Sequence, residues 1–224
     1  MSMKIHFRMI ILVFAALGFA SITGCAKSYV IADQPFLVAE APADLPKMPL
    51  RVAIVRTPAM KRVAVGFDED GEYGSRLAAA MLNGMQTAAT LSIRQVDLVE
   101  QTPTGGYDII CLPANPYFDV RRSRRNMVEV TLTLEVTIVE TATGKQKGML
   151  LEAEGVPGKR PAIPIQIQTR RGVERTQAGV TGALIYSSRL DQAVNNALFY
   201  LSLDFGEKLQ KRALEMLRRK QEAQ

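Results

Sequence analysis

The side chains that most often carry enzymatic chemistry are scarce in this 224-residue sequence. It contains one histidine, His6, two cysteines, Cys25 and Cys111, and no tryptophan. His6 and Cys25 lie within or at the edge of a segment with the pattern of a targeting sequence. Without that segment the chain has no histidine, and Cys111 is its one free thiol. This excludes histidine-based catalytic triads, histidine-ligated zinc sites and an internal disulfide.

Residues 1–24 have the pattern of a signal peptide that is removed. Lys4 and Arg8 give a positively charged start, and an apolar run of 12 residues, Met9–Ala20, follows. A helix of that length spans roughly 18 Å, well short of the ~30 Å hydrocarbon core of a membrane. The run therefore predicts a signal peptide and not a membrane span. Its loss lowers the formal net charge from +6 to +4, a balance that is not typical of nucleic-acid-binding proteins.

The end of this segment, Ile22-Thr23-Gly24-Cys25, resembles the bacterial lipobox, an aliphatic residue and two small residues before a cysteine. The resemblance implies cleavage between Gly24 and Cys25, a diacylglycerol on the Cys25 thiol and an acyl chain on its amine, with no other cofactor. Two or more acyl chains hold a protein firmly on a membrane. Ala26 stands where inner-membrane lipoproteins of this type have Asp, which implies the periplasmic face of the outer membrane. The alternative is an ordinary secretory signal with an incidental Cys25.

The mature chain divides into a tether and one domain. Residues 25–49 show neither a helical nor a strand period, and we expect them to form an extended tether. This stretch contains four prolines, Pro35, Pro42, Pro46 and Pro49. Residues 50–222 are long enough to bury one hydrophobic core, so we predict a single periplasmic domain there.

The hydrophobic pattern predicts the order strand, helix, strand, strand, strand, strand, helix. The strands are expected at 50–56, 91–99, 107–112, 127–140 and 147–154, and the helices at 75–89 and 188–220. Ser75 is the expected N-cap of the first helix, and Gly206 is a candidate kink in the last. Residues 155–186 are predicted to form either a loop or a projecting hairpin. The fold class is α+β, with a mixed four- to five-stranded sheet and both helices on one face.

The domain pattern also resembles a group of outer-membrane lipoproteins that build the bacterial envelope. They include the curli-secretion channel subunit, the activators of penicillin-binding proteins and the lipopolysaccharide-assembly lipoprotein. The shared features are the lipobox, the tether, the opening strand LRVAIVR, the segment 106–110 and the turn 140–144, over most of residues 50–210. The resemblance implies a non-catalytic accessory or scaffold subunit of an assembly, transport or secretion system. The chain departs from the channel family in one respect, because only a short connection separates Leu112 from Val128, where a channel subunit needs a membrane-crossing hairpin. An oligomeric secretion-channel subunit is therefore an alternative and not the leading hypothesis.

Two arginine clusters are the candidate partner-binding residues. They are Arg121, Arg122, Arg124 and Arg125 in the first cluster, and Arg170 and Arg171 in the second. We expect both clusters in turns, where guanidinium groups pair with phosphates or carboxylates. An envelope protein or an anionic envelope polymer is thus an expected partner, as are the lipids of the outer membrane, whereas nucleic acid is not; a homo-oligomer is also possible. The alternative is a solvated turn that protects a strand edge from aggregation.

An acidic stretch at residues 68–72 raises two further possibilities. Carboxylates bind Ca²⁺, but the position of Gly71 and the missing closing Glu do not fit an EF-hand loop. Asp68, Asp70 and Ser75 are the candidate residues of a cell-wall or lipid hydrolase, the alternative from another functional class. The triplet at 204–206 copies the Asp-Phe-Gly of kinases, but it lies in a predicted helix without the other kinase motifs, and we interpret it as a coincidence.

Overall fold

The computed structural model describes residues 47–66, 71–122, 128–157, 163–169, 172–178 and 189–222. Five strands form a mixed sheet in the order β2-β1-β3-β4-β5. The strands are β1 (Met48–Val55), β2 (Ile93–Val99), β3 (Ile109–Arg122), β4 (Val128–Glu140) and β5 (Gln146–Gly155). The helices are the 3-10 turn η2 (Pro58–Lys61), α2 (Glu72–Thr90) and α3 (Arg189–Glu222). Together they confirm the predicted α+β class and the mixed sheet with two helices.

β1 is an inner strand, parallel to β2 on one side and to β3 on the other. Its residues Val52–Val55 are buried on both faces, as their continuous apolar run predicts. Two parallel neighbours need a crossover connection, and α2 provides it between β1 and β2. β1 begins at Met48, inside the stretch predicted to be tether, because the Met48 amide donates to the Ser92 carbonyl at 2.8 Å.

β4 and β5 form the antiparallel hairpin that the sequence predicts. Along β4, buried residues alternate with more exposed ones from Val130 to Ile138. The exposed face is rich in threonine and glutamate, and the buried face meets the helices. β5 pairs with β4 over its whole length and is the last strand of the sheet.

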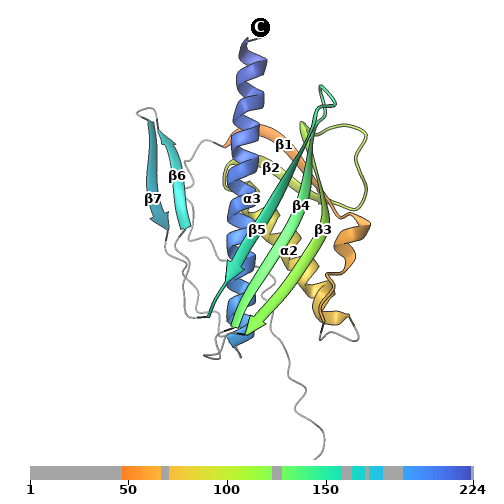
Figure 1. Ribbon diagram of the computed structural model, residues 1–224. Helices are drawn as coiled ribbons and strands as arrows, with labels where there is room; N and C mark the ends of the chain where they lie inside the picture. Colours follow the sequence, from red (N-terminus) through yellow and green to blue (C-terminus); the bar gives the residue numbers. More distant parts are fainter. Residues whose placement is uncertain are drawn as a thin grey trace, which may run out of the picture.

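Both helices pack on the same face of the sheet and enclose the main hydrophobic core (Figure 1). Phe199 and Phe205 of α3 and Met81 and Met85 of α2 are among the largest fully buried side chains. A smaller apolar cluster, centred on Ala53, lies on the opposite face of the sheet. No described helix is long and apolar enough to cross a membrane.

The prediction for β3 was wrong in its length. The strand continues from Leu112 to Arg122, through residues that the sequence indicated as a short connection. Two prolines lie within this longer strand. The carbonyl of Pro113 accepts the Thr57 hydroxyl at 2.6 Å, so this residue's hydrogen-bonding side faces away from β4 and needs no N–H there. Pro116 lies where the register with β4 shifts, a β-bulge.

The predicted cap of α2 was also wrong. The helix begins at Glu72, and its N-cap is Gly71, whose φ of 81° is a left-handed conformation that glycine adopts at little cost. The Ser75 hydroxyl donates to the Gly71 carbonyl at 2.8 Å, inside the first turn. Ser75 therefore bonds backward to a helix carbonyl and caps no amide.

α3 is a single helix of 34 residues whose C-terminal end projects beyond the strands (Figure 1). Gly206 does not divide it. A Cβ at this position would lie 3.1 Å from the Ala88 Cβ, so Gly206 allows close contact between α3 and α2. The apolar residues on the core-facing side of α3 are buried from Ala193 to Leu209, whereas Leu190 and Leu217 are partly buried and Leu214 is 39% exposed.

A second sheet of two antiparallel strands is formed by β6 (Ile163–Thr169) and β7 (Gly172–Ala178). The register pairs Ile163 with Ala178 and Thr169 with Gly172. This hairpin falls within residues 155–186, where the sequence left a loop and a projecting hairpin open.

The contact between β5 and α3 predicts a strong effect of Gly155→Ala. A Cβ on Gly155 would overlap the backbone of α3 at the Ala193 carbonyl and the Ala197 amide. Because backbone cannot rotate away as a side chain can, we expect a loss of about 3 kcal/mol in the free energy of unfolding. Urea unfolding followed by circular dichroism measures it.

Gly148→Ala is the matched control in the same strand. A Cβ at Gly148 has no neighbour within 4 Å, so this change should alter stability by only about 0.5 kcal/mol, in the favourable direction. Equal losses for the two variants would contradict the close packing of β5 on α3.

Candidate functional site

The structure places Arg121 and the backbone of Arg122 in a strand and not in the predicted turn. Arg121 lies in strand β3, in register with Glu129 of β4, and not in a turn. Its Nε is 3.1 Å from Asp119 Oδ2 on the face of the sheet that the helices leave uncovered. The lipobox residues Gly24 and Cys25, the side chain of Arg122, and residues Arg124, Arg125, Arg170 and Arg171 lie outside the described part of the chain.

The described residues of the acidic stretch and of the Asp-Phe-Gly triplet make contacts that stabilise the fold. Glu72 forms an ion pair with Arg76 at 2.8 Å, and Asp68, Glu69 and Asp70 lie outside the described residues. Within those residues no group of three His, Cys, Asp or Glu side chains is placed to hold a metal ion. The Asp-Phe-Gly triplet lies inside α3, where Phe205 belongs to the hydrophobic core.

Cys111 is fully buried in β3, as expected for a small apolar residue. Burial raises the pKa of its thiol to about 12, because a thiolate would lose its hydration there. The thiol is therefore protonated at neutral pH, in the form that is neither a nucleophile nor a metal ligand.

A network of charged residues joins the C-terminal half of α3 to the end of β4. The carboxylate of Glu140, which is 2% exposed, lies 2.7 Å from Arg212 Nη2 and 2.6 Å from Arg219 Nη2. Arg212 also donates through Nη1 to Glu215 at 3.0 Å, and Thr143 donates to Glu140 at 3.3 Å. Two carboxylates thus face two guanidinium groups, and the network is neutral.

The pKa of Glu140 reflects these contacts. Burial by itself raises the pKa of a carboxyl, but the hydrogen bond from Arg219 and the charges of Arg212 and Arg219 outweigh it. The pKa of Glu140 therefore lies below its ordinary value, and the group is ionised at neutral pH. The residue after Arg219, Lys220, donates to Asp108 at 3.2 Å and ties the helix to the residue before β3.

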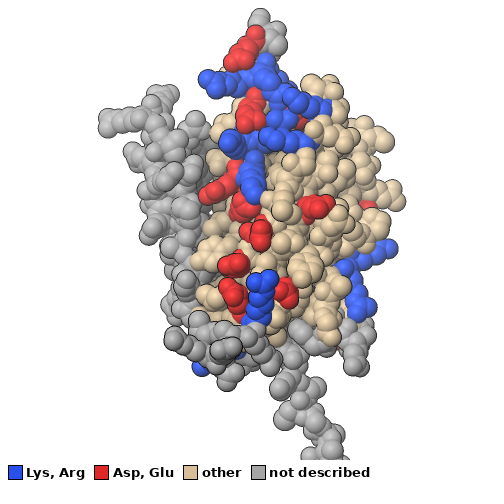
Figure 2. Space-filling model, in the orientation of Figure 1, with Lys and Arg blue, Asp and Glu red and all other residues tan. Residues whose placement is uncertain are grey.

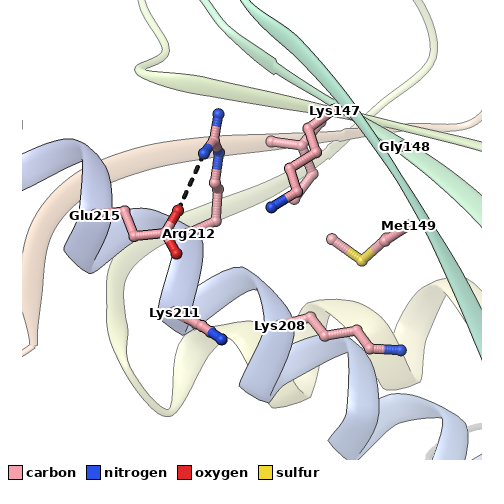
Figure 3. Close-up of a pocket in the computed structure, with 8 residues that line it drawn as sticks. Lys147, Gly148, Met149, Lys208, Lys211, Arg212 and Glu215 are labelled. Carbon is pink, nitrogen blue, oxygen red and sulfur yellow. Dashed lines mark hydrogen bonds and ion pairs between the residues drawn. The ribbon is translucent and has the colours of Figure 1, made fainter.

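A pocket with a volume of about 260 Å³ lies next to this network, between α3 and β5. Figure 3 shows side chains from both elements around it. The strands provide apolar surface and one lysine, and the helix provides four charged residues. The lining residues are Ile138, Lys147, Gly148, Met149, Lys208, Lys211, Arg212 and Glu215.

The charges of this pocket are unbalanced. Lys208 is held by Asp204 at 2.7 Å and by the Leu150 carbonyl at 2.8 Å. Lys147 and Lys211, in contrast, make no hydrogen bond or ion pair with the described residues. Figure 2 shows the wider setting, in which Lys and Arg gather over the C-terminal end of α3. The pocket is thus a concave surface with an excess of positive charge.

Sequence reasoning missed this pocket. Basic residues near the end of a helix suit the negative end of the helix dipole and do not by themselves indicate a site, and Lys147 follows a turn in a different part of the chain. Lys147 and Lys211 are far apart in the chain, and only the packing of α3 against β5 brings them to one cavity. The charge density of residues 208–220 was the one available signal.

The sequence matches no family model and no curated protein. Among solved structures, the chain is similar to the DUF330 protein XCC0632 from Xanthomonas campestris. The TM-score is 0.48 and the identity 10%, over 85% of this chain and 98% of that one. Two structures of the PelC dodecamer from Paraburkholderia phytofirmans have TM-scores of 0.30 and 0.28 and identities of 12% and 10%, over 70% of this chain and 91% and 92% of theirs. At such TM-scores these likenesses carry no information about function.

The buried carboxylate of Glu140 predicts a pH-dependent stability. Glu140→Gln leaves Arg212 and Arg219 without their shared partner, and we expect a loss of about 3 kcal/mol at pH 7. Because the folded pKa of Glu140 lies below the unfolded one, its contribution is complete above about pH 4.5 and declines as the pH falls through the folded pKa. Urea unfolding at several pH values should show wild type and variant converging in acid.

Glu100→Gln serves as the control. Glu100 is 77% exposed and lies 3.5 Å from Arg56, so its loss should cost less than about 1 kcal/mol. A Glu140→Gln variant with the stability of this control at pH 7 would refute the structural role of the network.

Proposed function

We propose that this protein is a non-catalytic lipoprotein on the periplasmic face of the outer membrane, an accessory or scaffold subunit of an envelope assembly, transport or secretion system. The observation that carries the proposal is the sequence Ile22-Thr23-Gly24-Cys25 directly after a 12-residue apolar run. A diacylated and N-acylated Cys25 anchors the chain without a membrane-spanning helix.

The length of chain between Cys25 and the first strand supports a role in positioning the domain near the membrane. About 20 residues separate Cys25 from the first strand at Met48, and an extended chain of that length reaches up to roughly 70 Å. Such a tether confines the domain to a thin layer beside the membrane and raises its local concentration near partners there. A modest interface on the domain is then sufficient for stable association.

The state of the titratable groups is consistent with a binding role. The buried Cys111 thiol stays protonated, and the Glu140 carboxylate is held by two arginines that fix α3. In each case the shifted pKa has a structural cause. The expected partner is an envelope protein or an anionic envelope polymer.

Lipidation is tested by labelling cells with radioactive palmitate and separating their membranes by density. We expect labelled wild type in the outer membrane, no label on Cys25→Ala, and labelled Ala26→Asp in the inner membrane. Cys111→Ala is the matched control and should keep both label and location. Label on Cys25→Ala, or wild type in the soluble fraction, would contradict the anchor.

The accessory role is tested by chemical crosslinking in intact envelopes. Wild type should capture an envelope protein or cell-envelope polymer that Cys25→Ala loses, because the released domain no longer has a raised local concentration. Replacement of Arg121, Arg122, Arg124 and Arg125 by Ser tests the predicted contact surface. Hydrolysis of cell wall or lipid by the purified protein, lost in Asp70→Asn, would favour the hydrolase alternative.

A further inference from the structure

The pocket between α3 and β5 retains positive charge that the fold does not neutralise. Lys208 is balanced by Asp204, and the two guanidinium groups of the network are balanced by Glu140 and Glu215. Lys147 and Lys211 remain, one on each side of the pocket. Both residues are exposed, and the one carboxylate of the pocket lining on which their charges act is Glu215, which also pairs with Arg212.

A third cation accompanies the two lysines. The side chain of Arg212 lines the pocket and is 10% exposed, and its guanidinium pairs with Glu140 and Glu215. Its Nε has almost no accessible surface, so Arg212 acts on an anion in the pocket through its charge and not through a hydrogen bond from Nε. Figure 3 shows Arg212 and Lys147 extending from helix and strand toward the same region.

The other side of the pocket is apolar. Ile138 is 2% exposed, and Met149 is partly buried against the core. The volume of about 260 Å³ is slightly smaller than that of pockets for drug-sized ligands. The pocket therefore fits an anionic group with a few attached methylenes, and not a complete lipid.

From these features we propose that the pocket binds a phosphate ester of an apolar group. The phosphate contacts Lys147 and Lys211 beside the charge of Arg212, and the first methylenes lie against Ile138 and Met149. A phosphomonoester carries about −1.5 to −2 charges at neutral pH, which matches two uncompensated lysines better than a carboxylate does. Recognition of such an amphiphile goes beyond the proposed accessory role and does not depend on the anchor at Cys25.

The carboxylate of Glu215 competes with a bound phosphate for the cations of the pocket. Its side chain is 44% exposed, and the pKa of its carboxyl is lowered by the hydrogen bond from Arg212 and by the charges of Lys147 and Lys211. The carboxylate thus interacts with the same cations that the phosphate requires. Removal of its charge should strengthen phosphate binding, whereas removal of the lysine charges should weaken it.

The test is isothermal titration calorimetry on the lipidated full chain in dodecyl maltoside, with protein-free micelles as the blank. The probes are hexyl phosphate and inorganic phosphate, which distinguish an amphiphile from a free ion. We expect hexyl phosphate to have a Kd at least about ten-fold lower than inorganic phosphate, because burial of its methylenes adds affinity.

Variants of opposite expected sign make the test specific. Lys147→Gln with Lys211→Gln should raise the Kd for hexyl phosphate by at least about ten-fold, and Glu215→Gln should lower it several-fold. The matched control, Lys61→Gln with Arg94→Gln, removes two exposed charges outside the pocket and should leave the Kd nearly unchanged. Thermal unfolding by circular dichroism checks that each variant folds.

Three results would overturn the proposal. One is equal affinity for the two probes, which would leave only a free-phosphate site. The second is an equal loss of affinity in the pocket variant and the control, which would show unspecific attraction by net charge. The third is weaker binding by a folded Glu215→Gln variant, which would mean that Glu215 supports the ligand.

Discussion

The buried carboxylate of Glu140 determines how the last helix lies on the sheet. It lies at the end of β4 and forms ion pairs with two arginines of α3. A long helix with many similar apolar positions therefore has one favoured register on the sheet. Hydrophobic contact alone is not directional and permits sliding. A buried charge, in contrast, is stable only with its partners in place, and this requirement ties the helix to the strands.

Close backbone contacts at two glycines also fix the position of α3. Gly155 lets the end of β5 touch the backbone of α3, and Gly206 lets α3 approach α2 at Ala88. Gly155 therefore allows the N-terminal part of α3 to lie close to β5, and Gly206 allows the middle of α3 to lie close to α2. Beyond them α3 and β5 enclose the basic pocket, in which long side chains take the place of close backbone contact. One helix thus serves both the core and the candidate binding site.

The sequence predicted the elements whose patterns are local and uninterrupted. The alternation along β4 and the apolar run of β1 were read correctly, because side chains in strands alternate between faces and a doubly covered strand has no polar face. β3 was predicted too short, and its additional length contains two prolines, which normally exclude an inner strand. Whether a proline is tolerated depends on which side of the strand is free, and here the neighbour β1 pairs only with residues 109–111. The start of α2 was misjudged for a similar reason, as Gly71 and Ser75 are both plausible near a helix end.

By itself, the sequence determined the α+β class, the order of the main elements and the scarcity of catalytic side chains, and it supports a lipid anchor at Cys25. These properties depend on composition and on patterns within short stretches of chain. Only the tertiary structure decided which charges are neutralised and which are left over. Charge balance depends on distances between residues that are remote in sequence, and in this fold those distances join Glu140 to Arg212 and leave Lys147 and Lys211 at a shared, unneutralised pocket.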